Sequence, residues 1–184
     1  AGALLVSSIE DGGVASGIGQ SSNAAANLVL NGGALEYVGT GQSTDRLFTL
    51  GVNGGTLTSS GTGPISFEST GDIVIDGVGS RTLFLDGANT GSNILSSRLT
   101  NDASGNVTKL TKQGAGKWRL KNTNLTFTGT VTVSEGNLTV DGTNPSSATC
   151  LSGATSNICV VPTPTPTPEP EPTPTPEPEP TPTP

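Results

Sequence analysis

Three aspartates are the residues whose type and spacing could do chemistry in this sequence. Asp72 and Asp76 are separated by two steps of the two-residue period of a strand, and Asp86 follows ten residues later. If they shared one face of a sheet, paired carboxylates could act as the general acid and base of a polysaccharide-cleaving enzyme. Each aspartate also adjoins a glycine, which favours solvated turn residues over an acidic site. We therefore predict that the chain is not an enzyme and has no catalytic residue.

Metal and cofactor sites are not expected either. The sequence has no histidine, and its two cysteines are too few for a zinc site. Cys150 and Cys159 lie close together among Ser, Gly and Asn, so we predict a small disulfide loop, with two free thiols as the alternative.

Basic residues gather in one short stretch, which is usually a solvated face. They are Lys109, Lys112, Lys117, Arg119 and Lys121. The chain also has a Pro-rich end that carries Glu169, Glu171, Glu177 and Glu179. Opposite charges on two exposed segments can pair within a molecule or between neighbours. We therefore expect these glutamates to dock on the basic stretch of the same chain or of a neighbouring copy.

Composition narrows the functional classes. The net charge of −7 argues against a nucleic-acid partner, because phosphate binding needs a basic face. No apolar run approaches the length that crosses a bilayer, so no membrane span is expected. With 3% aromatic residues and 26 glycines, the chain favours a thin interior built in layers over a thick globular core.

A period of two runs through residues 109–140 and predicts short strands separated by glycine-containing turns. The inward residues on this pattern are Trp118, Leu120, Leu125, Phe127, Val131, Val133, Leu138 and Val140. The apolar pair that begins at Trp118 recurs twenty residues later at Leu138, and the pair at Leu28 recurs at the same shift at Phe48. Such a repeat is typical of a β-solenoid, in which each turn buries its inward residues against the next.

The segment LTKQGAGKWRLKNTNLTFTGTVTVSEGNLTV resembles the autotransporter-associated β-strand repeat, a unit of bacterial autotransporter passengers and other large secreted surface proteins. The matching residues are Leu110, Lys112, Gly114, Gly116, Trp118, Leu120, Asn124, Gly129, Val133, Gly136 and Leu138. Together with similar upstream segments, the resemblance covers about Gly12 to Val140. It implies an all-β fold, a right-handed parallel β-helix, and export from the cell, and it carries no catalytic residues. The family usually occurs as many repeats in a long chain.

Three segments are expected: a β-helix over 1–145, a Cys-bridged end segment over 146–161, and an extended tail over 162–184. The tail has proline at every second position, which excludes a helix or an inner strand and predicts a polyproline-II arm roughly 70 Å long. Its candidate O-glycan acceptors are Thr163, Thr165, Thr167, Thr173, Thr175, Thr181 and Thr183. Because the sequence starts at Ala1, we expect an exported form whose signal peptide has been removed, in the extracellular space or at the cell surface.

The ends of the predicted solenoid decide the expected function. The first strand-like stretch, ALLVSSIE, and the last, LTV, look uncovered, and open strand edges can pair with another chain. Our leading expectation is therefore a structural subunit of an extracellular bacterial filament, with the protein itself as partner through head-to-tail stacking. The alternative is a monomeric surface adhesin or passenger stalk that contacts surface glycans or other envelope proteins. A carbohydrate-active enzyme is a distant third.

Overall fold

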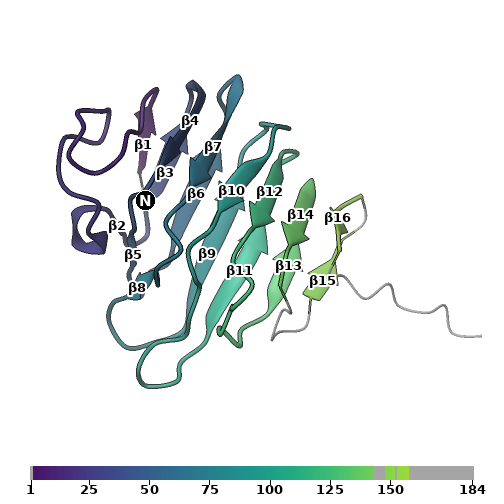
Figure 1. Ribbon diagram of the computed structural model, residues 1–184. Helices are drawn as coiled ribbons and strands as arrows, with labels where there is room; N and C mark the ends of the chain where they lie inside the picture. Colours follow the sequence, from purple (N-terminus) through teal and green to yellow (C-terminus); the bar gives the residue numbers. More distant parts are fainter. Residues whose placement is uncertain (1, 143–147, 152, 158–184) are drawn as a thin grey trace, which may run out of the picture.

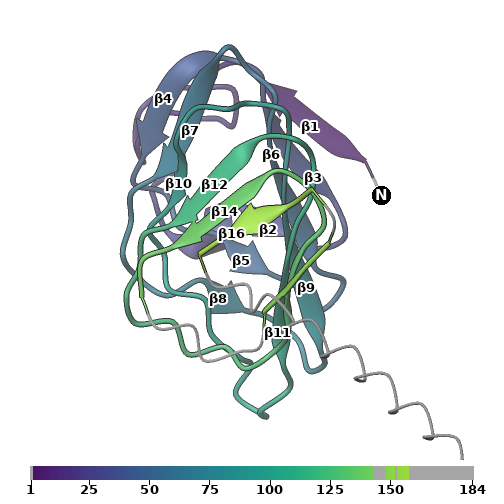
Figure 2. The ribbon, with the colours of Figure 1, turned by 90° about the vertical axis from the view of Figure 1, so that its right-hand side faces the viewer.

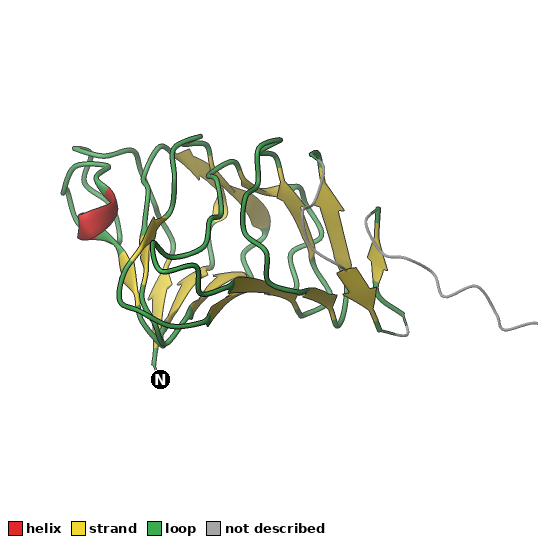
Figure 3. Ribbon diagram, turned by 90° about the horizontal axis from the view of Figure 1, so that it is seen from below, coloured by secondary structure: helices red, strands yellow, loops and turns green. Residues whose placement is uncertain are grey.

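The computed structural model describes residues 2–142, 148–151 and 153–157, which form parallel β-strands joined by loops (Figure 1). The helical content of this part is a three-residue 3-10 turn, η1 (Ala25–Asn27), at the N-terminal end of the stack (Figure 3). Within these residues, no helix is long and apolar enough to cross a membrane. The predicted all-β class is confirmed.

The described strands belong to three parallel sheets. The seven-stranded sheet contains, in spatial order, β1 (Ala3–Val6), β3 (Ala34–Tyr37), β6 (Gly55–Ser59), β9 (Arg81–Asp86), β11 (Thr108–Lys112), β13 (Val131–Val133) and β15 (Ala148–Cys150). The six-stranded sheet contains β4 (Thr40–Thr44), β7 (Gly63–Phe67), β10 (Asn93–Leu95), β12 (Lys117–Leu120), β14 (Asn137–Val140) and β16 (Thr155–Ser156). The three-stranded sheet contains β2 (Val29–Leu30), β5 (Thr49–Leu50) and β8 (Val74–Ile75).

The chain passes through the sheets in a repeating order, and we call each passage from one strand of the seven-stranded sheet to the next a coil. Every coil adds its strands beside those of the preceding coil, so the sheets grow along one axis (Figures 1 and 2). This connectivity is consistent with the predicted β-solenoid. The spacing of twenty in the sequence is the step between β12 and β14 and between β2 and β5, because Trp118 lies opposite Leu138 and Leu30 lies opposite Leu50. Other coils differ in length, since Leu83 of β9 lies opposite Leu110 of β11.

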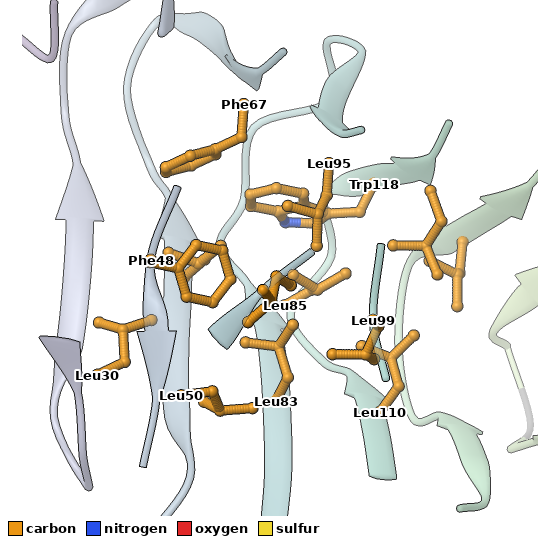
Figure 4. Close-up of a cluster of buried hydrophobic side chains, with 14 of the residues drawn as sticks. Leu30, Phe48, Leu50, Phe67, Leu83, Leu85, Leu95, Leu99, Leu110 and Trp118 are labelled. Atoms are coloured by element: carbon orange, nitrogen blue, oxygen red, sulfur yellow. The ribbon is translucent and has the colours of Figure 1, made fainter. Parts of the chain in front are cut away.

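A stack of aliphatic and aromatic side chains fills the interior between the sheets (Figure 4). In β9, Leu83 and Leu85 point inward and alternate with half-buried residues, as a period of two requires. The rings of Phe48 and Phe67 meet edge to face, with centroids 6.1 Å apart. The inward residues expected from the sequence are all buried: Trp118, Leu120, Leu125, Phe127, Val131, Val133, Leu138 and Val140.

Glycine is required at the turn that leads into β14. Gly136 has a backbone φ of 69°, a value that residues with a side chain rarely adopt. In addition, a Cβ at this position would lie 2.3 Å from the carbonyl oxygen of Gly116 in the preceding coil. The close stacking of coils therefore excludes a side chain at this position.

One expected strand is absent. Residues 121–130 contain no strand, although Leu125 and Phe127 are buried. The backbone amides of Thr126 and Phe127 both donate to the carbonyl oxygen of Leu99, 3.2 Å away in each case. The period of two thus predicted correctly which side chains point inward, but not the backbone hydrogen bonding. Two consecutive amides share one acceptor here, which breaks the hydrogen-bond ladder of a strand.

The described part of the segment predicted as a Cys-bridged end, residues 148–151 and 153–157, continues the coils. β15 pairs with β13, and β16 pairs with β14, so the strand that includes Leu138 and Val140 is not an open edge. Cys150 ends β15, and Cys159 lies outside the described residues, so the disulfide stays a prediction. Residues 158–184, which include the predicted tail with its glutamates and threonines, also lie outside the described residues.

The N-terminal end is covered over one of its sheets, which corrects the expectation of a fully open front. Residues 8–24 follow the outer edge of β4, where the amide of Ile9 donates to the side chain of Gln42 over 2.9 Å. Arg46, only 2% exposed, holds this loop through the carbonyl oxygens of Glu10, Ser22 and Gly19 at 2.9, 3.0 and 3.3 Å. The outer edge of β1 pairs with no described strand.

Candidate functional site

The basic stretch of the sequence is divided between two sheets. Lys109 is exposed on β11 of the seven-stranded sheet, whereas Lys117 and Arg119 are exposed on β12 of the six-stranded sheet. Lys121 follows β12 and lies 3.4 Å from the carboxylate of Glu68, with both side chains largely in solvent. The structure therefore brings only part of the expected basic face together, around β12.

Lys112 does not belong to that face, which corrects its assignment as a docking residue. Its side chain is fully buried, and its Nζ donates to the carbonyl oxygens of Gln113, Gly114 and Glu135 at 2.6, 2.6 and 3.3 Å. Desolvation by burial lowers the pKa of Lys112. Because Leu110 and Lys112 are two residues apart on β11, the period of two already assigns both to the inward face.

A groove of about 350 Å³ crosses the outer face of the six-stranded sheet, and we call it the β12–β14 groove. Its lining combines two cations with amide and hydroxyl groups: Thr90, Ser92, Lys117, Arg119, Asn137 and Thr139. Lys117 lies opposite Asn137, and Arg119 lies opposite Thr139, in the parallel pairing of β12 with β14. Strand alternation points all four side chains outward while Trp118 points into the core.

Arg119 is oriented by a carboxylate of the next coil. Its Nε donates to both carboxylate oxygens of Asp141 at 2.8 and 3.1 Å, and its Nη2 donates to one of them at 2.7 Å. This hydrogen-bonded pair holds the pKa of Asp141 below its usual value. Within the described residues the Nη1 group of Arg119 makes no hydrogen bond, so it remains available to a ligand.

Lys117 has no ion-pair or hydrogen-bond partner for its ammonium group among the described residues. Its backbone is held by the neighbouring strand β10, where the buried side chain of Asn93 donates to the carbonyl oxygen of Lys117 over 2.8 Å. On the neighbouring strand, Asn137 donates to the hydroxyl of Thr155 over 2.8 Å. The groove thus presents polar side chains on strands that are paired on both sides, and the ammonium group of Lys117 is free to bind a ligand.

Trp118 is the floor of the groove and not a carbohydrate-stacking platform, because it is only 1% exposed. Its indole Nε1 is anchored to the carbonyl oxygen of Asp86. Sugar contacts in this groove would therefore have to come from hydrogen bonds and charge.

Two of the three aspartates considered for catalysis, Asp72 and Asp86, are bound to other groups. Asp72 forms a bidentate ion pair with Arg98, with both contacts at 2.5 Å, and this pairing lowers the pKa of Asp72. Asp86 accepts hydrogen bonds from the amide of Gly87 and the side chain of Gln113 at 2.7 and 2.9 Å. Across residues 2–142, 148–151 and 153–157, no three His, Cys, Asp or Glu side chains form a group that could hold a metal ion.

The sequence interpretation missed Thr90, Ser92, Asn137 and Thr139. Asn137 and Thr139 were accessible in principle, because the twenty-residue repeat that aligns Trp118 with Leu138 also aligns Lys117 with Asn137. Thr90 and Ser92 come from a loop, whose position no periodicity encodes.

Comparison with known proteins gives one relevant similarity. The chain is 45% identical over 139 residues to the Adhesin BmaC autotransporter of Brucella suis biovar 1 (strain 1330). The aligned part is 74% of this chain and 4% of that protein, so the chain spans a small fraction of the relative's length. No family model and no solved structure matches the chain. The chain is therefore autotransporter-related, through its similarity to a short segment of an autotransporter adhesin.

Proposed function

We propose that the chain is a passenger segment of an exported, autotransporter-type surface adhesin. Its right-handed parallel β-helix would act as a stalk that holds binding surfaces away from the cell. The observation that carries the proposal is the 45% identity to an autotransporter adhesin over most of this chain. The growth of the sheets by one coil at a time supports it, because such a fold extends along one axis and presents long lateral faces.

The proposed role is binding and support, without catalysis. Asp72 and Asp86, two of the aspartates that could have formed an acid–base pair, are bound to Arg98 and Gln113. The lateral polar groove on β12 and β14 is suited to contact a ligand on another surface. The proposed location is the outside of the cell.

The proposal is tested by inserting the chain into the passenger of an autotransporter carrier in a Gram-negative laboratory host. Antibody labelling and protease access on intact cells measure display, and attachment to cultured host cells measures adhesion. We expect efficient display and stronger attachment than with the same carrier lacking the segment. Failure to be displayed would exclude a passenger role, and display without added attachment would exclude the adhesin role.

End-to-end self-assembly is the second candidate, and one observation favours it. Leu4 and Leu5 on β1 are 53% and 59% exposed at the unpaired outer edge of the seven-stranded sheet. A groove of about 260 Å³ lies beside them and is lined by Leu28 and Val29 among others. The loop over β4 limits such stacking to the other sheets. Electron microscopy at high protein concentration distinguishes filaments, which Leu5→Glu should abolish, from discrete particles.

A further inference from the structure

The β12–β14 groove combines features that select a ligand by charge. The chain as a whole carries a net charge of −7, yet the groove presents Lys117 and Arg119 on one strand face. Their Cα atoms lie about 6–7 Å apart, because a strand rises about 3.3 Å per residue. Asp141 neutralises one charge and fixes the guanidinium of Arg119, while Arg119 Nη1 and Lys117 Nζ keep free donors. The groove therefore favours an anionic ligand.

The surroundings of the two cations favour a polyhydroxylated ligand. Hydroxyl and amide groups of Thr90, Ser92, Asn137 and Thr139 line the rest of the groove. Such groups both donate and accept hydrogen bonds, which matches the hydroxyls of a sugar. They come from two places along the stack: Thr90 and Ser92 from the loop before β10, and Asn137 and Thr139 from β14. β10 and β14 flank β12, so these groups can contact a ligand that runs across the strands.

A peptide is a poorer fit to the same groove. Extended peptides bind by adding a strand to an open sheet edge, or by placing prolines in aromatic-lined pockets. β12 is already paired on both sides, with β10 and β14, and Trp118 beneath it is buried. The groove therefore offers neither an open backbone edge nor an aromatic-lined pocket.

We propose that the β12–β14 groove binds an acidic polysaccharide, with Lys117 and Arg119 contacting carboxylates of uronate-type sugars. Thr139 donates to the side-chain oxygen of Asn137 over 3.3 Å, and Asn137 donates to the hydroxyl of Thr155 over 2.8 Å. The remaining hydrogen-bonding positions of Asn137 and Thr139 would contact the sugar hydroxyls. This assignment deepens the proposed adhesin function and depends on it for its biological role, but the binding itself is a property of the isolated chain.

The test measures binding of oligogalacturonate to the full chain by calorimetry at low ionic strength, with fully methyl-esterified oligogalacturonate as the uncharged comparison. We expect binding of the acidic form alone, weakened by added salt. Lys117→Gln and Arg119→Gln should each weaken binding by about tenfold, the effect of losing one charge-assisted hydrogen bond. Lys109→Gln is the matched control, since Lys109 is an exposed strand cation on the other large sheet.

The assignment would be overturned by no binding of the acidic oligosaccharide, by equal binding of the esterified form, or by equal effects of Lys117→Gln and Lys109→Gln. Tighter binding of a synthetic peptide of residues 165–180 in this groove would assign it to the Glu-Pro tail instead. Fluorescence of Trp118, the single tryptophan of the chain, verifies that the variants fold. Displayed cells that adhere equally well with Lys117→Gln would refute a role of the groove in adhesion and leave the adhesin role standing. Glycan binding by the purified chain without adhesion of the displaying cells would support binding in the groove and refute the adhesin role.

Discussion

The indole Nε1 of Trp118 donates a hydrogen bond to the main-chain carbonyl oxygen of Asp86, 2.9 Å away, although the two residues are 32 positions apart. Asp86 ends β9 in one coil, and Trp118 lies on β12 in the next. The bond links the two large sheets across neighbouring coils, and it satisfies the polar group of the largest buried side chain.

Replacing Trp118 tests this link. Trp118→Phe keeps an aromatic core residue but leaves the Asp86 carbonyl without its donor, so we expect a loss of about 1–3 kcal/mol in the free energy of unfolding. Trp118→Ala also opens a cavity and should cost about 3–5 kcal/mol. Urea unfolding followed by circular dichroism measures both. Equal stability of Trp118→Phe and the parent chain would show that the hydrogen bond contributes nothing.

Lys112 supports three carbonyl oxygens from inside the stack, so its ammonium group should stabilise the fold in spite of its desolvation. Lys112→Met preserves most of the side-chain volume and leaves those acceptors unsatisfied, which should lower the unfolding free energy by about 1–3 kcal/mol. Lys117→Met is the control on the exposed face and should change stability by less than about 0.5 kcal/mol. Chemical denaturation of the pair provides the comparison. A smaller effect at Lys112 than at Lys117 would contradict the buried role.

Arg46 should control the order of the loop over β4. Arg46→Met removes the guanidinium that binds the carbonyl oxygens of that loop, and Arg46→Lys keeps the charge without the planar set of donors. We expect faster hydrogen–deuterium exchange over residues 9–23 in Arg46→Met, an intermediate rate in Arg46→Lys, and unchanged exchange in β9 and β11. Uniform exchange changes across all sheets would instead indicate general destabilisation.

Asp102 should make the loop between β10 and β11 sensitive to acid. Hydrogen bonds from the backbone amide of Gly79 and from Asn106 and Ser104, opposed by burial, lower the pKa of Asp102 from 3.8 to about 2. A carboxyl group whose pKa is lower in the folded state than in the unfolded state stabilises the fold at every pH above its unfolded-state pKa. This stability is lost as the pH falls through the folded-state pKa. Between about pH 4 and pH 2, stability should therefore fall more in the parent chain than in Asp102→Asn. Thermal unfolding across this range measures the difference, and parallel pH profiles would contradict it.

The sequence predicted which residues of the strands point inward and how some neighbouring strands pair in register. The period of two assigned Trp118 and Leu138 to the interior, and their shift of twenty gave the register between β12 and β14. These features depend on local backbone geometry and on the need of each coil to bury its inward face, so they leave a regular trace in the sequence.

The individual cations were a different matter. Arg46 is buried where carbonyl oxygens of the loop over β4 surround its guanidinium. Lys112 is buried because it points inward on β11, and Lys117 is exposed because it points outward on β12. Composition treats these residues as equivalent charges. The loop residues Thr90 and Ser92 reach the groove only through the way their loop folds back on the sheet.

The sequence by itself determined the repeating strand pattern, the identity of most inward residues and the thin, glycine-punctuated core, because each follows from spacing along the chain. Only the tertiary structure decided that Arg46 is buried, which sheet edge the N-terminal loop covers and which polar groups share the β12–β14 groove. The physical reason is that these features depend on contacts between coils, where hydrogen-bond partners come from residues far apart in the sequence.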